Sequence, residues 1–432
     1  MKVTVIGTGY VGLVTGTCLA HFGLAVTCVD IDERKIATLH SGEIPIYEPG
    51  LQELVVKNVA AGRLHFSTDV AGNIPGAEVI FLAVGTPPAP DGSADMTYVF
   101  DAVKTISKHH RGYQVVVTKS TVPVGTGARI QAILEKDHDP ATFAVASNPE
   151  FLREGCAVSD FLNPDRIVLG CDDPKGLEVL LRLYKPMREQ DAPIVVTNRA
   201  TAELIKYASN GFLAVKITFI NEVSRLCEAV GADVMQVAKG MGMDPRIGPR
   251  FLQPGPGYGG SCFPKDTRAL LDVARAEGVR LKVVEAAVEA NEDQIVRALA
   301  KIDGALGGAR GKVVALLGLA FKGDTDDVRE SPAVKVARGL LAAGAAVRAY
   351  DPAAAENGRR EAPGIQVAAD PYEAARGADA VVVATEWSEF KSLDWARLRG
   401  VLKAPVAVDL RNLYAPSQVR EAGFAYVSLG RA

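Results

Sequence analysis

Short apolar runs recur in the first part of the chain, and the first three are followed by glycine or aspartate. They have the length of buried strands and lie at residues 2–6, 25–29, 78–84, 115–118 and 144–146. The segment 13–22 is small and apolar enough to form a closely packed helix. A strand, a glycine turn and a helix in this order are typical of a parallel, doubly wound sheet. We therefore predict a Rossmann-like domain over residues 1–196.

The same pattern returns near the end of the chain. Apolar runs lie at 312–317, 347–350, 380–384 and 406–408. The first of them again ends in a glycine, Gly318, but residues 318–332 lack the GxGxxG spacing. We predict a second, smaller Rossmann-like domain over residues 301–432, which binds something other than a second dinucleotide; a mononucleotide portion fits.

A long helical run lies between the two predicted sheets. Thr197 and Asn198 are typical helix caps, and the run extends from about Arg199 to Val230 before Gly231 ends it. This is roughly three times the mean helix length. We expect a spine helix within a central region, 197–300, and a helix of this kind often supplies a dimer interface. The predicted class is α/β, with two Rossmann-like doubly wound domains joined by a long central helix.

Composition narrows the possible partners. The 432 residues are 48% hydrophobic and 23% charged, as in a soluble globular protein of about two or three domains. A net charge of −3 without basic runs among aromatics argues against nucleic acid, and no apolar run reaches the roughly 18 residues that span a membrane. The six cysteines have neither paired nor zinc-site spacing. We expect free thiols, no metal, small-molecule partners and a cytoplasmic location.

The first glycine turn indicates a dinucleotide site. Gly7 makes the turn, Gly9 lets the backbone approach a pyrophosphate, and Gly12 lets the helix pack on the strand. Asp30 ends the next strand 18 residues after Gly12 and suits a ribose 2′-hydroxyl, which favours NAD over NADP. Lys35 either reaches the same ribose or is solvated. A glycine turn in some other α/β protein is the alternative.

Loops after the later strands carry further candidates. Thr86 and Thr121 follow the third and fourth strands at the edge where doubly wound sheets bind ligands, although Thr121 equally suits a helix cap. Residues 87–97, around Asp91, are expected to form a surface turn. Glu150 and Glu154 lie four residues apart after the fifth strand. One of them suits a base and the other a cofactor contact, with a solvated loop as the alternative.

One cysteine lies between a glycine-rich bend and an expected helix start. Cys262 follows Gly260-Ser261 and precedes Pro264, which suits the first position of a helix that ends near Gly278. The helix dipole and Lys265 are expected to lower the pKa of this thiol below its free value of about 8.5 and to favour the nucleophilic thiolate. A buried structural thiol is the alternative.

Basic and amide side chains on the long helix and in later loops are candidates for binding an oxyanion and phosphate groups. Lys206 and Asn210 are i and i+4 on the spine helix, so both project from one face and suit a developing oxyanion, unless they form a solvated polar stripe. The Gly- and Pro-rich loop 246–256 carries arginines that suit a diphosphate. Further bases in loops that follow strands of the second sheet are Lys322, Arg329 and Arg411, against the alternative of ordinary surface charges.

The available chemistry favours a four-electron oxidation. All six histidines lie at or before His138, so the rest of the chain has no imidazole base, which a simple hydroxy-acid dehydrogenase usually needs. A plain alcohol oxidation does not use a thiol. A thiolate adds to an aldehyde, the hemithioacetal then loses a second hydride, and water hydrolyses the thioester. The predicted reaction takes a primary alcohol to a carboxylate with two NAD⁺.

Six motifs together resemble the UDP-glucose 6-dehydrogenase family, in the right order over nearly the whole chain. They are Gly-Tyr-Val-Gly at 9–12, Val-Gly-Thr-Pro at 84–87, Thr-Val-Pro at 121–123, Asn-Pro-Glu-Phe-Leu-Arg-Glu-Gly at 148–155, Gly-Gly-Ser-Cys-Phe-Pro-Lys-Asp at 259–266, and the run 318–332. The resemblance implies an NAD domain, a central helix that forms a homodimer, and a C-terminal domain for the UDP portion. Tyr258 stands where phenylalanine is common in the family, with ring and size kept.

The resemblance also implies roles for matching residues. Cys262 would be the nucleophile, Lys206 and Asn210 would stabilise the oxyanion, Asp266 and Thr121 would hold the water for proton transfer, and Glu150 would assist thioester hydrolysis. The implied NAD contacts are Gly7, Gly9, Tyr10, Val11, Gly12, Asp30, Lys35, Thr86, Thr121, Glu154, Lys265 and Arg329. The implied UDP-glucose contacts are Glu150, Phe151, Leu152, Arg153, Glu154, Lys206, Asn210, Arg246 from the partner subunit, Phe251, Leu252, Gln253, Pro254, Gly255, Gly259, Lys322 and Arg411.

Two rival functions remain at this point. A dehydrogenase for GDP-mannose or a UDP-aminosugar would share the fold and mechanism, although Phe263 favours UDP-glucose within the resemblance. A non-catalytic NAD-binding regulator would also keep the fold. Cys262, Lys206 and Asn210 argue against the regulator, because a binding module gains nothing from a thiol at a helix start.

Overall fold

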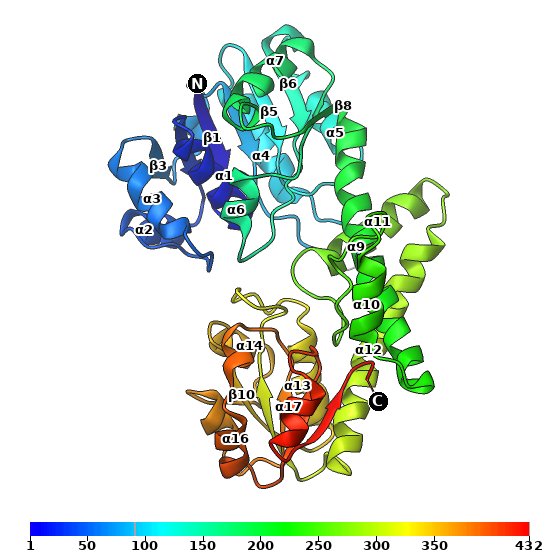
Figure 1. Cartoon of the computed structure of the whole chain (residues 1–432). Coiled ribbons are helices and arrows are strands. Elements are labelled where there is room, and N and C mark those ends of the chain that lie inside the picture. Colours follow the sequence, from blue (N-terminus) through cyan, green and yellow to red (C-terminus); the bar gives the residue numbers. More distant parts are fainter. Residues whose placement is uncertain (90–91, 432) are drawn as a thin grey trace. The chain divides into compact units, whose positions relative to one another are not determined.

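The computed structural model describes residues 1–89 and 92–431 and divides the chain into two compact units. The first unit comprises Met1–Ser209 with Arg268–Gly278, and the second comprises Asn210–Thr267 with Val279–Ala432. The path of the chain through each unit can be followed in Figure 1. Asp91, in the predicted turn at 87–97, lies outside the described residues.

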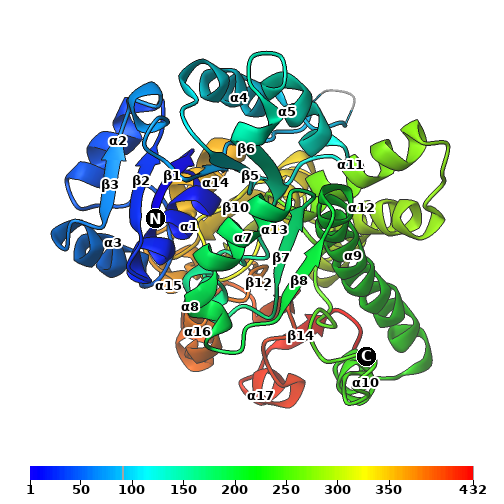
Figure 2. The ribbon, with the colours of Figure 1, turned by 90° about the horizontal axis from the view of Figure 1, so that it is seen from above.

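The first unit is built on an eight-stranded sheet of order β3-β2-β1-β4-β5-β6-β7-β8. All neighbouring strands are parallel except β6 and β7, which pair antiparallel. In Figure 2, β3, β2 and β1 lie side by side at one edge. The strands are β1 (Lys2–Ile6), β2 (Ala25–Val29), β3 (Leu64–Ser67), β4 (Val79–Leu82), β5 (Gln114–Thr118), β6 (Phe143–Ser147), β7 (Ile167–Cys171) and β8 (Ile194–Thr197).

Helices cover both faces of this sheet. The strands β4 and β5 are therefore buried on both sides. One core contains apolar side chains of α1, α3, α6 and α7, and the opposite core contains those of α4 and α5. The helices are α1 (Tyr10–His21), α2 (Glu33–His40), α3 (Leu51–Ala60), α4 (Thr97–His109), α5 (Thr126–Leu134), α6 (Ala157–Leu162), α7 (Pro174–Leu183) and α8 (Lys185–Arg188). The helix expected at 13–22 begins earlier, at Tyr10, so that Gly12 lies inside it.

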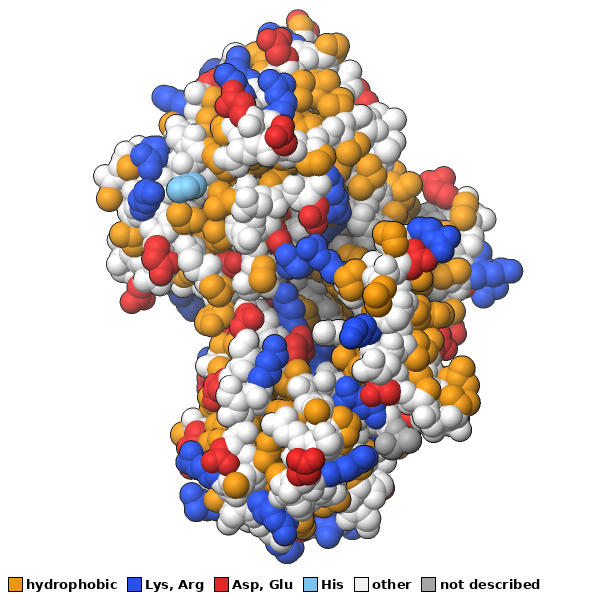
Figure 3. Space-filling model, in the orientation of Figure 1, with side chains coloured by type: hydrophobic (Ala, Val, Ile, Leu, Met, Phe, Trp, Pro, Cys, Tyr) orange, Lys and Arg blue, Asp and Glu red, His pale blue; other side chains and the backbone are white. Residues whose placement is uncertain are grey.

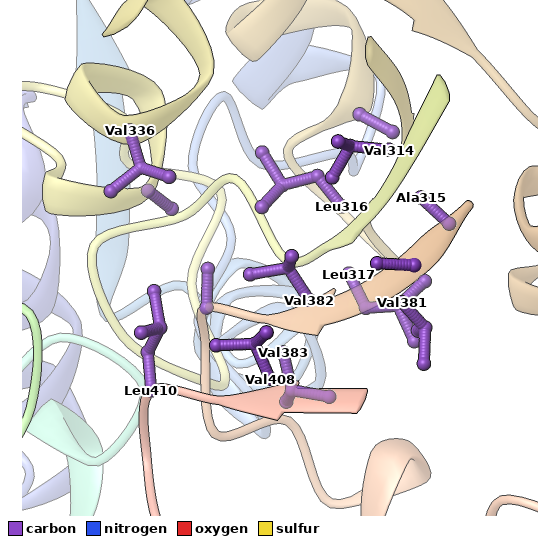
Figure 4. Close-up of a cluster of buried hydrophobic side chains, with 14 of the residues drawn as sticks. Val314, Ala315, Leu316, Leu317, Val336, Val381, Val382, Val383, Val408 and Leu410 are labelled. Atoms are coloured by element: carbon purple, nitrogen blue, oxygen red, sulfur yellow. The ribbon is translucent and has the colours of Figure 1, made fainter. Parts of the chain in front are cut away.

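The second unit contains a parallel six-stranded sheet of order β11-β10-β9-β12-β13-β14, which is the strand order of a dinucleotide-binding fold. Val314 and Leu316 of β9, Val382 of β12 and Val336 of α13 belong to its core, shown in Figure 4. The strands are β9 (Val313–Leu317), β10 (Ala346–Tyr350), β11 (Gln366–Val367), β12 (Ala380–Val383), β13 (Val406–Asp409) and β14 (Ala425–Ser428). The helices are α13 (Pro332–Ala342), α14 (Ala355–Glu361), α15 (Pro371–Ala375), α16 (Trp395–Val401) and α17 (Pro416–Glu421).

Four helices occupy the middle of the chain. They are α9 (Arg199–Val230), α10 (Val234–Gly242), α11 (Phe263–Ala276) and α12 (Lys282–Leu306). The bounds of α9 equal the predicted ones, and the predicted fold class, two Rossmann-like sheets and a long linking helix, is confirmed. Among the described residues, no helix is long and apolar enough to cross a membrane. On the face in Figure 3, basic and acidic side chains are intermingled.

Candidate active site

The glycine turn after β1 combines one crowded and one open position. Gly7 has φ +101°, in the left-handed region that favours glycine. A Cβ on Gly12 would lie 1.9 Å from the Gly7 carbonyl oxygen, so Gly12 has to lack a side chain for α1 to start here. A Cβ on Gly9 would meet no atom within 4 Å. The start of α1, whose first N–H groups have no partner within the helix, therefore has open space at Gly9, as the approach of a pyrophosphate requires.

Asp30 lies directly after β2 and is anchored to this turn. One carboxylate oxygen accepts hydrogen bonds of 2.8 Å from the Thr8 amide and hydroxyl, and the other accepts one of 3.0 Å from the Asp32 amide. Burial would raise the pKa of Asp30, but these bonds and the Lys35 ammonium, 3.7 Å away, lower it overall. A fixed carboxylate suits ribose hydroxyls and would repel a 2′-phosphate, so the donor set fits NAD.

Thr86 and Thr121 meet beyond the carboxyl ends of β4 and β5. The Thr86 hydroxyl donates to the Thr121 carbonyl oxygen at 3.0 Å. The N-cap of α5 is Gly125, whose amide donates to Glu203 at 2.7 Å, and Gly127 donates to the same carboxylate. A side chain of α9 thus caps α5, which leaves the Thr121 side chain outside the cap.

The loop after β6 carries a buried ion pair. A carboxylate oxygen of Glu150 lies 2.8 Å from the Lys206 ammonium, and both side chains are at most 5% exposed. Glu150 also accepts a hydrogen bond from the Leu152 amide. Burial would raise the pKa of Glu150, but Lys206, this amide and Lys119 outweigh it and lower the pKa. Two predicted catalytic residues are therefore in contact, and Glu150 is held ionised as a base requires.

Lys119 extends this cluster and was not singled out in the sequence. Its ammonium donates to the Asn148 side-chain oxygen at 2.9 Å, and Tyr184 donates to the same oxygen. Burial lowers the pKa of Lys119, Glu150 partly opposes this and Lys206 adds to it, and together they bring the pKa to about 8. With Lys206 and Glu150 the cluster holds two lysines and one carboxylate, an arrangement that favours a further negative charge.

Glu48 is a second residue that sequence reasoning missed. It is 5% exposed and binds the Tyr10 hydroxyl, the Gly155 amide at 2.7 Å and the Val158 amide at 3.2 Å. It thereby ties the glycine turn to the end of the 148–155 loop. Burial and the nearby carboxylates Glu48 and Glu154 raise the pKa of Tyr10. The only local sign is an acid in a Pro-Gly loop, which does not name its partners.

The cysteine stretch lies in the second unit. Helix α11 begins at Phe263, one residue before the predicted Pro264, and the Cys262 carbonyl oxygen accepts its first backbone hydrogen bond, from the Asp266 amide at 2.8 Å. Cys262 is half-buried, and its sulfur lies 3.5 Å from the Ser261 hydroxyl oxygen. The thiol therefore sits at the positive end of a helix, as its nucleophilic form requires.

Asp266, one turn into α11, is hydrogen-bonded to two other predicted site residues, Asn210 and Lys265. Its carboxylate is fully buried and accepts 2.6 Å hydrogen bonds from the Asn210 amide and from the Lys265 ammonium. The polar groups next to Cys262 are thus fixed by one another.

Predicted substrate residues also meet at the carboxyl edge of the second sheet. The Arg411 guanidinium donates to the carbonyl oxygens of Ala384 and Phe321, each at 2.9 Å, and pairs with Glu386 at 3.0 Å. A Cβ on Gly255 would lie 3.0 Å from the same guanidinium. Lys322 is half-buried, with its ammonium 5.6 Å from the Phe321 ring centre.

Three predicted arginine contacts have exposed side chains that pair with neighbouring carboxylates. Arg153 binds Asp160, Arg246 binds Asp244 and Arg329 binds Asp327, at 2.6, 2.6 and 2.7 Å. Their roles stay predictions. Of the remaining candidates, Phe151 and Leu152 are half-buried, Leu252 and Pro254 are buried, and Gln253 is exposed.

Strained backbone accompanies the candidate residues of the second unit. Among the described non-glycine residues with positive φ, Phe251, at 65°, is itself a candidate. Three more lie within two residues of Lys322, Arg329 or Arg411, namely Asp324, Glu330 and Asn412. Such conformations cost roughly 1–3 kcal/mol each and cluster at ligand sites.

Asp351 directly follows β10, as Asp30 directly follows β2, but its carboxylate has other partners. Asp351 is 3% exposed, and one carboxylate oxygen accepts hydrogen bonds from Leu319, Ala320 and the Trp387 indole. Its other oxygen accepts the amides of Ala353 and Ala354. Five hydrogen bonds within the protein thus engage this carboxylate, against three for Asp30, and the prediction that the second sheet binds something other than a second dinucleotide stays a prediction.

Comparison with known proteins gives consistent matches over the chain. Residues 1–188, 200–293 and 315–416 match the NAD binding, central and UDP binding domains of the UDP-glucose/GDP-mannose dehydrogenase family. A UDP-glucose 6-dehydrogenase of Rhizobium meliloti is 52% identical, with both chains covered completely.

Two solved structures share the fold over the full chain. A UDP-glucose dehydrogenase from Pyrobaculum islandicum is 40% identical with a TM-score of 0.92, covering 100% of this chain and 98% of its own. A UDP-D-ManNAc dehydrogenase from Pyrococcus horikoshii is 29% identical with a TM-score of 0.88, covering 100% and 99%. With its fold, its nucleotide turn and its cysteine stretch, the chain belongs to the UDP-glucose/GDP-mannose dehydrogenase family.

Proposed function

We propose that the chain oxidises UDP-glucose to UDP-glucuronate, with two NAD⁺ and one water consumed per sugar. The observation that carries this proposal is Cys262 at the start of α11, one turn before the buried Asp266 carboxylate that Asn210 and Lys265 hold. The full-length relative at 52% identity is named for UDP-glucose, whereas the aminosugar dehydrogenase shares only 29%. This difference favours UDP-glucose over a UDP-aminosugar.

NAD, when bound, supplies the hydride acceptor for both oxidations. The residues that would hold it are the turn Gly7–Gly12, with open space at Gly9, and Asp30 at the end of β2. Tyr10, Val11, Lys35, Thr86, Thr121, Glu154, Lys265 and Arg329 complete the proposed set. The division into an NAD domain at 1–196, a central region at 197–300 and a UDP domain at 301–432 belongs to the same proposal.

Cys262 acts after the first oxidation. The C6 alcohol loses a hydride and a proton to become an aldehyde, and the thiolate adds to the aldehyde carbon. The resulting thiohemiacetal loses a second hydride and a proton and becomes a thioester. Water then cleaves the carbon–sulfur bond, which releases the carboxylate and restores the thiolate. Lys206 and Asn210 stabilise the oxyanions with N–H donors, Asp266 and Thr121 hold the water, and Glu150 takes a proton from the hydrolytic water.

The substrate assignment is tested by product stoichiometry. The purified chain with NAD⁺ and UDP-glucose should form two NADH for each sugar consumed, and mass spectrometry should find UDP-glucuronate as the product. GDP-mannose and a UDP-aminosugar, assayed in parallel, should give at most about one hundredth of the rate, because a site built to bind one set of hydroxyls leaves polar groups unpaired with the others. Turnover of GDP-mannose alone would overturn the substrate and keep the mechanism.

We also propose a homodimer formed through α9. Phe212, Phe219 and Leu226 are seven residues apart, so they lie on one face of the helix, and they are 65%, 47% and 62% exposed. An apolar stripe of this kind is typical of a subunit interface. The double variant Phe219→Ser, Leu226→Ser should be monomeric by light scattering where the wild type is a dimer. Val367→Ser, at a valine on β11 that is 41% exposed, should leave the dimer intact.

A cytoplasmic location is part of the proposal. None of the six cysteines, all of which lie in the described parts of the chain, forms a disulfide, and Cys156 is exposed. Free thiols are kept in reducing compartments, which supports this location.

A further inference from the structure

The backbone that leads to Cys262 is irregular and buried. Residues 254–260 lie between α10 and α11, outside helices and strands, and all of them are buried. Buried N–H and C=O groups need hydrogen-bond partners, because an unpaired one costs about 1–3 kcal/mol. Outside helices and strands, neighbouring side chains and other backbone segments have to supply many of these partners.

Three buried side-chain amides provide them. Asn221 on α9 accepts a 2.8 Å hydrogen bond from the Gly255 amide, and Gln294 on α12 donates one of 2.7 Å to the Gly255 carbonyl. Asn291 on α12 accepts from the Tyr258 amide at 2.8 Å and donates to the Tyr258 carbonyl at 3.2 Å. The amide residues are 2–5% exposed. They reproduce for this loop the pairing that a neighbouring strand gives in a sheet.

The loop packs closely against the Asn291 side chain. Gly257 has φ +118°, and a Cβ there would lie 3.0 Å from the Asn291 side-chain oxygen. On its other side the loop packs against the segment before α13. The Gly260 amide donates to the Arg329 carbonyl at 2.9 Å, and a Cβ on Gly259 would lie 2.3 Å from the Glu330 carbonyl oxygen. Backbone held on both sides leaves little freedom to the residues that follow it.

We propose that Asn291, assisted by Gln294 and Asn221, is a positioning residue for the Cys262 nucleophile. Asn291 fixes the backbone four residues before the sulfur, and the rigid start of α11 follows directly. The proposal rests on the proposed function, in which Cys262 captures the aldehyde. A displacement of about 1 Å from the reactive geometry can cost about 100-fold in rate. Losing Asn291 should therefore weaken capture more than it weakens cofactor binding.

The test compares Asn291→Ala with Gln114→Ala. Gln114 is also a buried amide that binds backbone carbonyls, those of Ile74 and Ala77, and it belongs to the first unit, whereas Cys262 belongs to the second. Both variants should lose similar thermal stability. Asn291→Ala should lower kcat about 10- to 100-fold with the KM for NAD within about 2-fold, and NADH formed per UDP-glucose consumed should fall below two as a hydrazide traps escaping aldehyde. Gln114→Ala should keep kcat within about 2-fold and the ratio at two.

Equal kcat and equal stoichiometry in the two variants would overturn the proposal. If Asn291→Ala does not fold, Gln294→Ala and the isosteric Asn291→Asp, which keeps the acceptor and loses the donor, decide by the same readouts. A wild type that does not oxidise UDP-glucose would reject the proposed function instead. In that case the alkylation rate of Cys262 by iodoacetamide, followed by peptide mass spectrometry, should still change in Asn291→Ala and stay unchanged in Gln114→Ala; equal rates in the two would reject the positioning role separately.

Discussion

Replacing Cys262 by serine is expected to reduce formation of the acid by at least about 10³-fold. A serine hydroxyl stays protonated at neutral pH, so the start of α11 no longer presents an anion to the aldehyde. In the proposed mechanism the sulfur takes no part in the first oxidation. A slow reaction that yields one NADH per sugar, with trappable aldehyde, should therefore remain measurable by absorbance and mass spectrometry.

Cys156→Ser is the matched control for this experiment. Cys156 is exposed and belongs to none of the proposed catalytic groups. Its loss should leave both the rate and the ratio of two NADH per sugar unchanged. Undiminished acid formation by Cys262→Ser would remove the nucleophile from the mechanism.

Two glycines of the same turn should respond to alanine in opposite ways. Gly12→Ala places a methyl group 1.9 Å from the Gly7 carbonyl oxygen and 3.0 Å from the Ala83 Cβ, so the backbone has to move. Overpacking of this kind costs about 1–3 kcal/mol or more, and we expect a lower melting temperature together with loss of NAD binding. Gly9→Ala meets no protein atom within 4 Å and should melt like the wild type.

The Gly9 methyl group would instead occupy the space in which we place the pyrophosphate. We expect the Kd for NAD⁺ to rise at least about 10-fold, which corresponds to about 1.4 kcal/mol, in a fluorescence or calorimetric titration. Gly76→Ala, another open position in the first unit, controls for the substitution itself. NAD⁺ affinity in Gly9→Ala equal to that of the control would place the cofactor elsewhere.

The strands predicted from the sequence are those with uninterrupted apolar runs. The structure adds several that lack this signal, among them β3, β7 and β8. In β7, Gly170 interrupts the pattern for a tertiary reason, since a Cβ there would lie 2.5 Å from the Ala202 side chain of α9. The β8 run is as short as the predicted run at 115–118, and it differs in that Val195 and Val196 are exposed. Local periodicity does not report which helix crosses a strand.

The candidate site likewise contains residues that a local sequence pattern identifies and residues that no local pattern identifies. The residues next to them in the sequence determine the role of a glycine in a turn and of a cysteine before a helix. Gly12 and Cys262 could therefore be identified from neighbouring residues. Glu48 binds an amide 107 residues away and Asn291 one 33 residues away, and each lies in a segment with no local sign of these partners. Such residues become visible only when the fold supplies their neighbours.

The enclosed carboxylate of Asp351 bears on the order of events in turnover. Five hydrogen bonds within the protein engage Asp351, and only the acid after β2, Asp30, is assigned to a ribose in the proposed function. With one dinucleotide site, the chain has to release NADH and bind a second NAD⁺ between the two oxidations. In the proposed mechanism the partly oxidised sugar remains bound during that exchange, and its covalent bond to the Cys262 sulfur would keep it from diffusing away.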